Sequence, residues 1–280
     1  MRIKVLSDST CDLSAELVAK NDVTLIPLNV IKNGENFKDG VTITPEEIFS
    51  HVAAGGDLCS TAAVSIGDYE EIFAKYAAEY DGVVHINIGS GFSASHQNAR
   101  LAAEEFDNVL VVDSMSLSTG QAMIVLEACR LAREGADLAA IKASLEDLVR
   151  KVEISFVLDR LEYMVKGGRC SAAAALGANL LNLKPCIEVK EGKLQVVKKY
   201  RGSFTKCLQS YVKDRLAGRE DIRRNLLFIT HTAVSQESID AVWQCVAQNG
   251  GFETIEDTVA GCTVSCHCGP GTLGIIFVRN

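Results

Sequence analysis

The sequence has no run of about 18 uninterrupted apolar residues, so no transmembrane helix is expected. Its first six residues are typical of a strand and lack the charged and apolar regions of a signal peptide. Basic residues are not in excess either, because 28 Lys and Arg stand against 36 Asp and Glu, giving a net charge of −8. General nucleic-acid binding needs surplus cations that displace counterions. We therefore expect a cytoplasmic protein that binds no nucleic acid.

Common catalytic and metal-binding patterns are also missing. The Gly-x4-Gly-Lys-Ser/Thr motif of a nucleotide-binding P-loop does not occur, and no carboxylate cluster indicates a metal. Ten cysteines in a chain without a signal peptide favour reduced thiols over a disulfide framework. Cys262, Cys266 and Cys268 surround His267, but no second Cys or His pair completes a zinc pattern. We expect neither a metal nor a cofactor.

What the chain does have is ample core material, with 280 residues of which 48% are hydrophobic. A chain of this length forms one large α/β domain or two smaller ones. Strands alternate with helices up to about residue 150, which is typical of βαβ units and a mostly parallel sheet. The second half contains an antiparallel hairpin over residues 185–197 among mixed elements. We predict two α/β domains, residues 1–150 and 151–280, with a ligand between them.

A few local assignments bear on the site. Residues 24–31 are predicted to form one apolar strand, and Asp12 is predicted to be the N-cap of the first helix. Residues 172–183 are apolar and small, which is typical of a buried helix. His267 is predicted to lie in a rigid Gly-Pro-Gly turn before the last strand.

The most informative stretch is the apolar strand of residues 83–88 with the loop that follows it. The loop contains Gly89, Gly91 and three serines between residues 90 and 95, and it leads into a helix. Backbone N–H groups and hydroxyls at the N-terminus of a helix bind anions and carboxylates. Hydroxyl-rich loops follow other strands as well, and ligands bind beyond the carboxyl ends of parallel strands. We predict that this loop binds the acidic head group of a small molecule.

The sequence of the same loop also resembles motifs of two kinds of enzyme. Residues 89–94 fit G-x-G-x-x-A, with Asp113 closing the next strand, as in dinucleotide-binding folds. That match lies in a later βα unit than the first, and its serines would crowd a pyrophosphate. Ser93, Asp113 and His267 also follow the chain order of an α/β-hydrolase triad, but Ser95 stands where a nucleophile elbow needs glycine. A nicotinamide-dependent oxidoreductase or a small-molecule hydrolase using Ser93 is the alternative.

Basic side chains supply further candidates. Arg169 follows two glycines at a predicted helix start, where a guanidinium offers fixed paired donors to an anion. His267 can donate to a carboxylate or a phosphate. Residues 184–206 contain seven basic and two acidic side chains, a local reversal of sign that could dock an acidic partner, an anionic membrane surface or a nucleotide. A surface arginine and a solvated hairpin are the simpler interpretations.

These motifs resemble those of the DegV family, from one end of the chain to the other. The most specific block joins Leu161-Glu162-Tyr163 to Gly167-Gly168-Arg169. The other matching segments are residues 8–13, 90–93, 112–114, 183–185 and 267–271. The resemblance implies a two-domain α/β protein with one long-chain fatty acid buried between its domains. It also implies a lipid-carrying subunit of bacterial fatty acid kinase, without chemistry of its own, that presents the carboxylate to a separate ATP-dependent kinase making acyl phosphate.

Carried over by motif, the resemblance implies that Thr61 and Ser93 hold the fatty acid carboxylate, with a backbone N–H near Ala94 assisting. His267 would face the head group. Two arginines would lie near the kinase contact and outside the lipid pocket: Arg169 and Arg201.

The chain departs from the family pattern in two places. Residues 62–64 read Ala-Ala-Val where the family commonly has Ser-Gln-Pro, and Ala94 replaces the usual glycine after Ser93. Both hydroxyls predicted to hold the carboxylate are nevertheless present.

Overall fold

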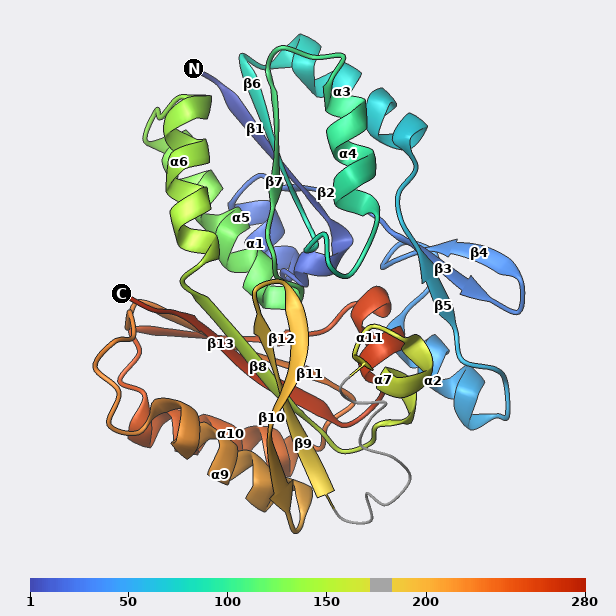
Figure 1. The fold of residues 1–280 in the computed structure, drawn as a ribbon, viewed down its shortest axis with the longest axis vertical. Helices are drawn as coiled ribbons and strands as arrows, with labels where there is room; N and C mark the ends of the chain where they lie inside the picture. The colour runs from blue at the N-terminus through green and yellow to red at the C-terminus, as the bar shows by residue number, and fades with distance from the viewer. Residues whose placement is uncertain (172–182) are drawn as a thin grey trace.

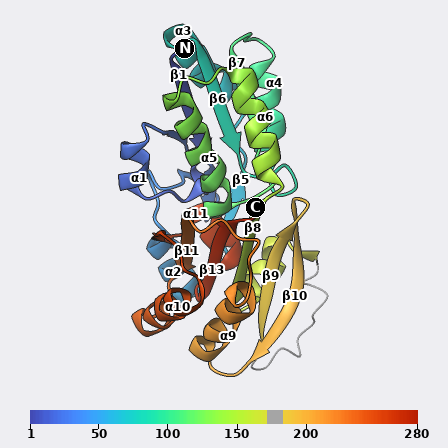
Figure 2. The same cartoon turned by 90° about the vertical axis from the view of Figure 1, so that its left-hand side faces the viewer.

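The computed structural model describes residues 1–171 and 183–280, so the helix predicted over residues 172–183 lies almost wholly outside the described residues. Two lobes are stacked along the long axis of the molecule (Figures 1 and 2). Each lobe is built on its own sheet, and a small third sheet stands beside them. No helix in the described part of the chain is long and apolar enough to cross a membrane.

The first lobe contains a parallel sheet with the strand order β2-β1-β6-β7. Its strands are β1 (Ile3–Asp8), β2 (Thr24–Ile26), β6 (Gly82–Asn87) and β7 (Val109–Asp113). Both faces of β6 are buried, because Val84 packs toward one face and Val83 toward the other, as successive side chains of a strand must. One face is covered by α3 (Ile66–Glu79) and α4 (Ser95–Ala103). The other is covered by α1 (Ala15–Lys20), α5 (Ser118–Arg133) and α6 (Leu138–Val149).

The second lobe contains a mixed sheet with the strand order β10-β9-β8-β13-β11-β12. Only β11 and β12 pair in parallel. The strands are β8 (Val152–Leu158), β9 (Leu183–Lys190), β10 (Lys193–Arg201), β11 (Leu226–Thr232), β12 (Thr254–Val259) and β13 (Thr272–Val278). One face carries α9 (Phe204–Leu216) and α10 (Gln236–Asn249), and the other carries α7 (Glu162–Gly167) and α11 (Cys262–Cys268). The predicted fold class, a parallel sheet followed by a mixed one, is confirmed.

Helix α5 belongs to both lobes (Figure 2). Its first eight residues are all buried. The hydrophobic cluster that includes the last four of them, 122–125, also contains Val84 and Ile86 of the first sheet and Ile154 and Ile276 of the second. One continuous core therefore runs from the first lobe to the second around this helix.

The prediction of a single strand over residues 24–31 is wrong. β2 ends at Ile26, and the chain continues into a separate antiparallel sheet with the order β4-β3-β5. Pro27 separates the two strands because it has no N–H to donate to a ladder. This sheet and the helix beside it comprise β3 (Asn29–Lys32), β4 (Glu35–Lys38), α2 (Pro45–Ala53) and β5 (Ser60–Ala62).

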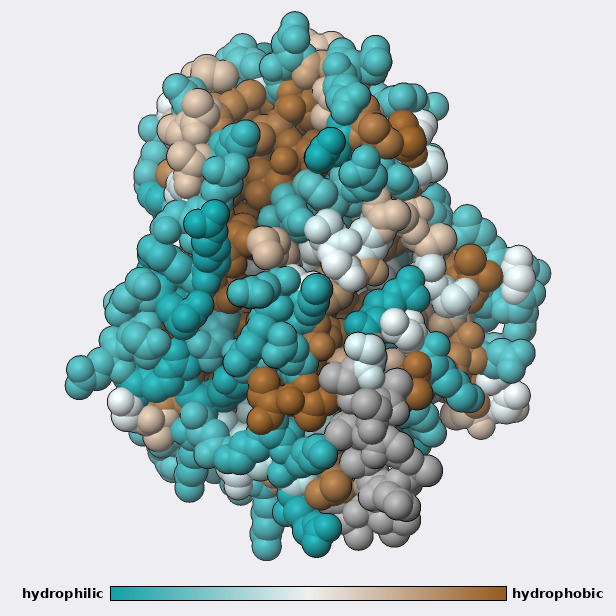
Figure 3. Space-filling model, in the orientation of Figure 1, coloured by the Kyte–Doolittle hydropathy of each residue, from teal (hydrophilic) through white to brown (hydrophobic). Residues whose placement is uncertain are grey.

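Most of the molecular face in Figure 3 is hydrophilic, as the charge content predicts. Apolar side chains are visible over β7, between α4 and α6, because β7 is an edge strand whose side chains are only partly covered.

Candidate functional site

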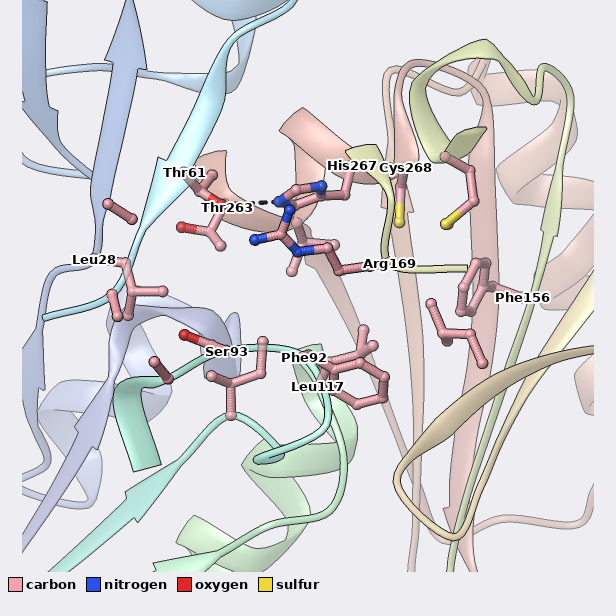
Figure 4. Close-up of a pocket in the computed structure, with 17 residues that line it drawn as sticks. Leu28, Thr61, Phe92, Ser93, Leu117, Phe156, Arg169, Thr263, His267 and Cys268 are labelled. Carbon is pink, nitrogen blue, oxygen red and sulfur yellow. Dashed lines mark hydrogen bonds between the residues drawn. The ribbon is translucent and has the colours of Figure 1, made fainter. Parts of the chain in front are cut away.

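A cavity of about 810 Å³, including its space open to solvent, lies where the two lobes and the small sheet meet. Its wall is mostly apolar, with side chains from both lobes: Leu28, Ile88, Phe92, Leu117, Phe156 and Met164. The polar side chains that line it are Thr61, Ser93, Arg169, Thr263 and His267 (Figure 4). This combination suits a ligand with a long apolar part and one polar end.

A second cavity of about 340 Å³, including its space open to solvent, lies beside the first and is lined mainly by strands of the second lobe. The two cavities share four lining residues: Leu117, Phe156, Val264 and Cys268. The side chains between the two cavities are therefore apolar or weakly polar.

The loop after β6 contributes Ser93 and Ala94 to the cavity at the N-terminus of α4. Ser93 Oγ accepts a hydrogen bond from the Ser95 backbone N–H at 3.1 Å and lies 3.0 Å from Ser95 Oγ. Ser93 therefore bonds to the first residue of α4 and lines the cavity at the same time. The positive end of the helix dipole adds to the attraction of this corner for an anion.

Thr61 of the small sheet and His267 of the second lobe meet at the cavity. Thr61 Oγ1 of β5 and His267 Nε2 of α11 are 2.8 Å apart (Figure 4). Burial, assisted by the positive charge of Arg169, lowers the pKa of His267 to about 4. The imidazole is therefore neutral at pH 7, and it offers the cavity a hydrogen-bonding group without a full charge.

His267 lies in the last turn of α11, so the prediction of a simple turn around it is wrong. A carboxylate from the first 40 residues of the chain binds the N-terminus of this helix. Asp39 accepts hydrogen bonds from the N–H groups of Cys262 at 2.8 Å and Thr263 at 3.2 Å, and from Ser9 Oγ at 2.9 Å. Contacts between residues more than 200 positions apart thus build the element that carries His267.

Asp12 takes part in the same junction, and its prediction as the N-cap of α1 is wrong. Ser14 has that role, accepting from the Leu17 N–H at 3.2 Å. Asp12 instead accepts from the Gly261 N–H at 2.8 Å and from Ser118 Oγ at 2.5 Å. Burial raises the pKa of Asp12 to about 8 despite these bonds.

Close approach explains two glycines at the rim. A Cβ on Gly91 would collide with the carbonyl oxygen of Gly192, at the tip of the β9–β10 hairpin. A Cβ on Gly167 would collide with Nδ1 of His267. The hairpin tip therefore packs directly against the loop after β6, and the end of α7 packs directly against His267.

Comparison with known families agrees with this geometry. A family model described as "Uncharacterised protein, DegV family" matches residues 2–280. The chain belongs to the DegV family. A DegV domain-containing protein of Deinococcus radiodurans is 30% identical, over 98% of this chain and 98% of its own length. One from Clostridium acetobutylicum is 29% identical, over 100% of this chain and 99% of its own.

Solved structures of other DegV family members have the same fold. A Thermus thermophilus member described as fatty-acid-binding is 33% identical with a TM-score of 0.93, and the match covers 100% of both chains. A Thermotoga maritima protein described as having a fatty acid binding function is 26% identical with a TM-score of 0.85, over 99% of both chains. The family predicted from the motifs is confirmed.

The two arginines of this DegV family chain lie in different places. Arg169 lines the cavity, so the prediction that it lies outside the pocket is wrong. Its side chain is exposed, donates to the Gly167 carbonyl at 2.9 Å and reaches toward the His267 ring (Figure 4). Arg201 is exposed at the end of β10 and does not line the cavity.

The three residues that follow the order of a hydrolase triad have separate hydrogen-bond partners. Ser93 bonds to Ser95, and His267 bonds to Thr61. Asp113 accepts hydrogen bonds from the backbone N–H groups of Ser90, in the loop after β6, and of Met115. In the part of the chain that the structure describes, no hydrogen bond joins Ser93, Asp113 and His267.

The cysteines near His267 point into different parts of the core. Cys262 and Cys266 pack with Cys59, whereas Cys268 packs with Phe156 and its neighbours. Residues 1–171 and 183–280 contain no group of three or more His, Cys, Asp and Glu side chains that could hold a metal ion.

Two residues of the site were missed by sequence reasoning. Asp39 carries no local signal, because its partners lie in α11 at the far end of the sequence. Thr263 lies four residues before His267, and helical spacing of these two residues could have indicated it.

Proposed function

We propose that this chain binds a long-chain fatty acid, with the acyl tail in the apolar cavity and the carboxylate at Thr61, Ser93 and His267. The observation that carries the proposal is the apolar cavity ending at these polar groups, in a chain 33% identical to a fatty-acid-binding DegV family protein. The Ala94 N–H at the start of α4 completes the carboxylate site.

Tail and head group contribute different parts of the binding. Each buried CH₂ is worth about 0.8 kcal/mol, so a tail of about sixteen carbons supplies of the order of 10 kcal/mol before binding costs are subtracted. Hydroxyls, a neutral imidazole and a helix N-terminus orient the carboxylate without fully neutralising it. The carboxylate therefore stays available as a nucleophile for a phosphoryl donor.

The proposal includes a separate ATP-dependent kinase that phosphorylates the bound fatty acid to acyl phosphate in the cytoplasm. The sequence has no P-loop of its own. Arg169 and Arg201 are exposed on the second lobe and would contact the kinase, Arg169 from the rim of the cavity. The basic run of residues 184–206 would contribute to this contact or to a transient membrane-surface contact. Residues 1–150 and 151–280 would form the two domains that enclose the lipid.

The decisive experiment is to denature the purified protein and identify the released ligand by mass spectrometry. A stoichiometric fatty acid is the expected result. Bound nicotinamide, or ester hydrolysis abolished by Ser93→Ala, would contradict the proposal and favour an enzyme.

Variants then test the head-group assignment. Thr61→Val and Ser93→Ala should both lower fatty acid retention, because each removes a hydroxyl from the polar end of the cavity. Ser93→Ala should also cost about 1 kcal/mol of stability through the lost hydrogen bond from the Ser95 N–H. The matched control is Ser14→Ala, which removes the cap of α1 away from the cavity and should leave retention unchanged. Equal retention by all three variants would show that the hydroxyls are structural.

A further inference from the structure

Thr263 differs from the other hydroxyl-bearing residues of the cavity. Thr61 Oγ1 is bonded to His267 and Ser93 Oγ to Ser95. Thr263 lines the same cavity and is only 4% exposed, yet its Oγ1 is buried without a hydrogen-bond partner among the described residues. Its backbone N–H is occupied separately by Asp39.

Buried polar groups in proteins are nearly always hydrogen-bonded, and leaving one unpaired is costly. A threonine inside a helix usually avoids this by bonding to the carbonyl four residues earlier. Thr263 is the second residue of α11, so the carbonyl four residues earlier is that of Val259, at the end of β12 and outside the helix. The hydroxyl of this cavity-lining residue therefore lacks the partner that a helix normally supplies.

The placement of Thr263 links it to the polar end of the cavity. Thr263 lies four positions before His267, and this spacing puts both side chains on one face of α11. In Figure 4, Thr263 lies between Thr61 and Ser93, and its oxygen is turned away from the His267 ring. A carboxylate has two oxygens with about four lone-pair positions, so it can accept from a third hydroxyl besides Thr61 and Ser93.

We propose that Thr263 is a third hydroxyl ligand of the bound carboxylate, donating from Oγ1 to a head-group oxygen. This inference rests on the proposed fatty acid function and deepens it. It makes the site selective for a head group that only accepts hydrogen bonds, because three neighbouring hydroxyls of the protein would all be donors to it. A fatty alcohol with the same tail has a single weaker acceptor oxygen.

The test compares ligand-free wild-type protein with Thr263→Val and Thr263→Ser, using hexadecanoic acid and hexadecan-1-ol as probes. Valine keeps the shape of threonine and the backbone N–H but removes the hydroxyl, whereas serine keeps the hydroxyl. Thr263→Val should raise the Kd for the acid by about tenfold or more, the effect of losing a hydrogen bond to a charged group. The Kd for the alcohol should change by less than about threefold, and Thr263→Ser should restore acid binding.

Ser265→Ala is the matched control on the same helix. Its hydroxyl donates to the Ala260 carbonyl at 3.2 Å and does not line the cavity, so the variant should lower the melting temperature without changing either Kd. An unchanged Kd for the acid in Thr263→Val would overturn the inference. Equal losses for acid and alcohol would also overturn it, since they indicate packing rather than a hydrogen bond. Wild-type protein that binds neither probe would refute the proposed function itself.

Discussion

The strongest structural prediction concerns Asp39, which binds the N-terminus of α11 from the other end of the sequence. Asp39→Ala removes the acceptor of the Cys262 and Thr263 N–H groups and of Ser9 Oγ. Loss of a carboxylate cap costs about 1 kcal/mol, and a buried N–H left unpaired costs about 1–3 kcal/mol more. We therefore expect a loss of about 3 kcal/mol in the free energy of unfolding.

Chemical denaturation measures this loss directly, and a thermal melt should show a decrease of about 5–10 °C in Tm. Fatty acid affinity should fall as well, because α11 carries both Thr263 and His267. The matched control is Asp137→Ala, which removes an exposed carboxylate cap from α6, where Asp137 accepts from the Ala140 N–H at 2.8 Å. It should cost only about 1 kcal/mol and leave affinity unchanged.

Two results would refute this reasoning. If Asp39→Ala and Asp137→Ala cost the same stability, the buried bonds to α11 are worth no more than a surface cap. If Asp39→Ala loses stability but keeps its affinity for fatty acid, the position of α11 does not depend on its capped N-terminus.

Further variants test the remaining parts of the site. Arg169→Ala should weaken fatty acid binding because Arg169 lines the cavity, whereas Arg201→Ala should impair only phosphorylation by the kinase. If the two variants have equal effects on fatty acid binding and on phosphorylation, the different positions of the two arginines do not matter. His267 has a folded-state pKa of about 4 against about 6.5 when unfolded, so the unfolded chain binds more protons between these values. Wild-type stability should therefore fall as pH drops from 6.5 to 4, and denaturation curves of His267→Gln should show a weaker dependence. Gly91→Ala should cost about 1–3 kcal/mol and weaken ligand retention, because the new methyl group displaces the hairpin at Gly192; a variant as stable as wild type would contradict that contact.

Local chemistry was sufficient to predict much of this fold. The hairpin around Gly192 and the alternation of strands and helices in the first half both follow from short-range patterns. The break at Pro27 also has a local cause that the apolar pattern of residues 24–31 obscured.

The errors involve residues that act over long distances in sequence. Asp12 has the composition of a helix cap, but its partners are Gly261 and Ser118. Arg169 follows a glycine pair that predicts an exposed side chain, and it is exposed, yet the same side chain borders the cavity. Periodicity and capping rules describe contacts between residues a few positions apart. They therefore do not show which distant residues complete a site.

The core shared around α5 has a consequence for how the molecule denatures. Either half alone would expose buried faces of this helix or of the strands that pack against it, so neither fragment should fold independently. Heating should then produce one cooperative transition rather than two. A calorimetric trace with two resolved peaks would mean that the halves melt separately in spite of the helix they have in common.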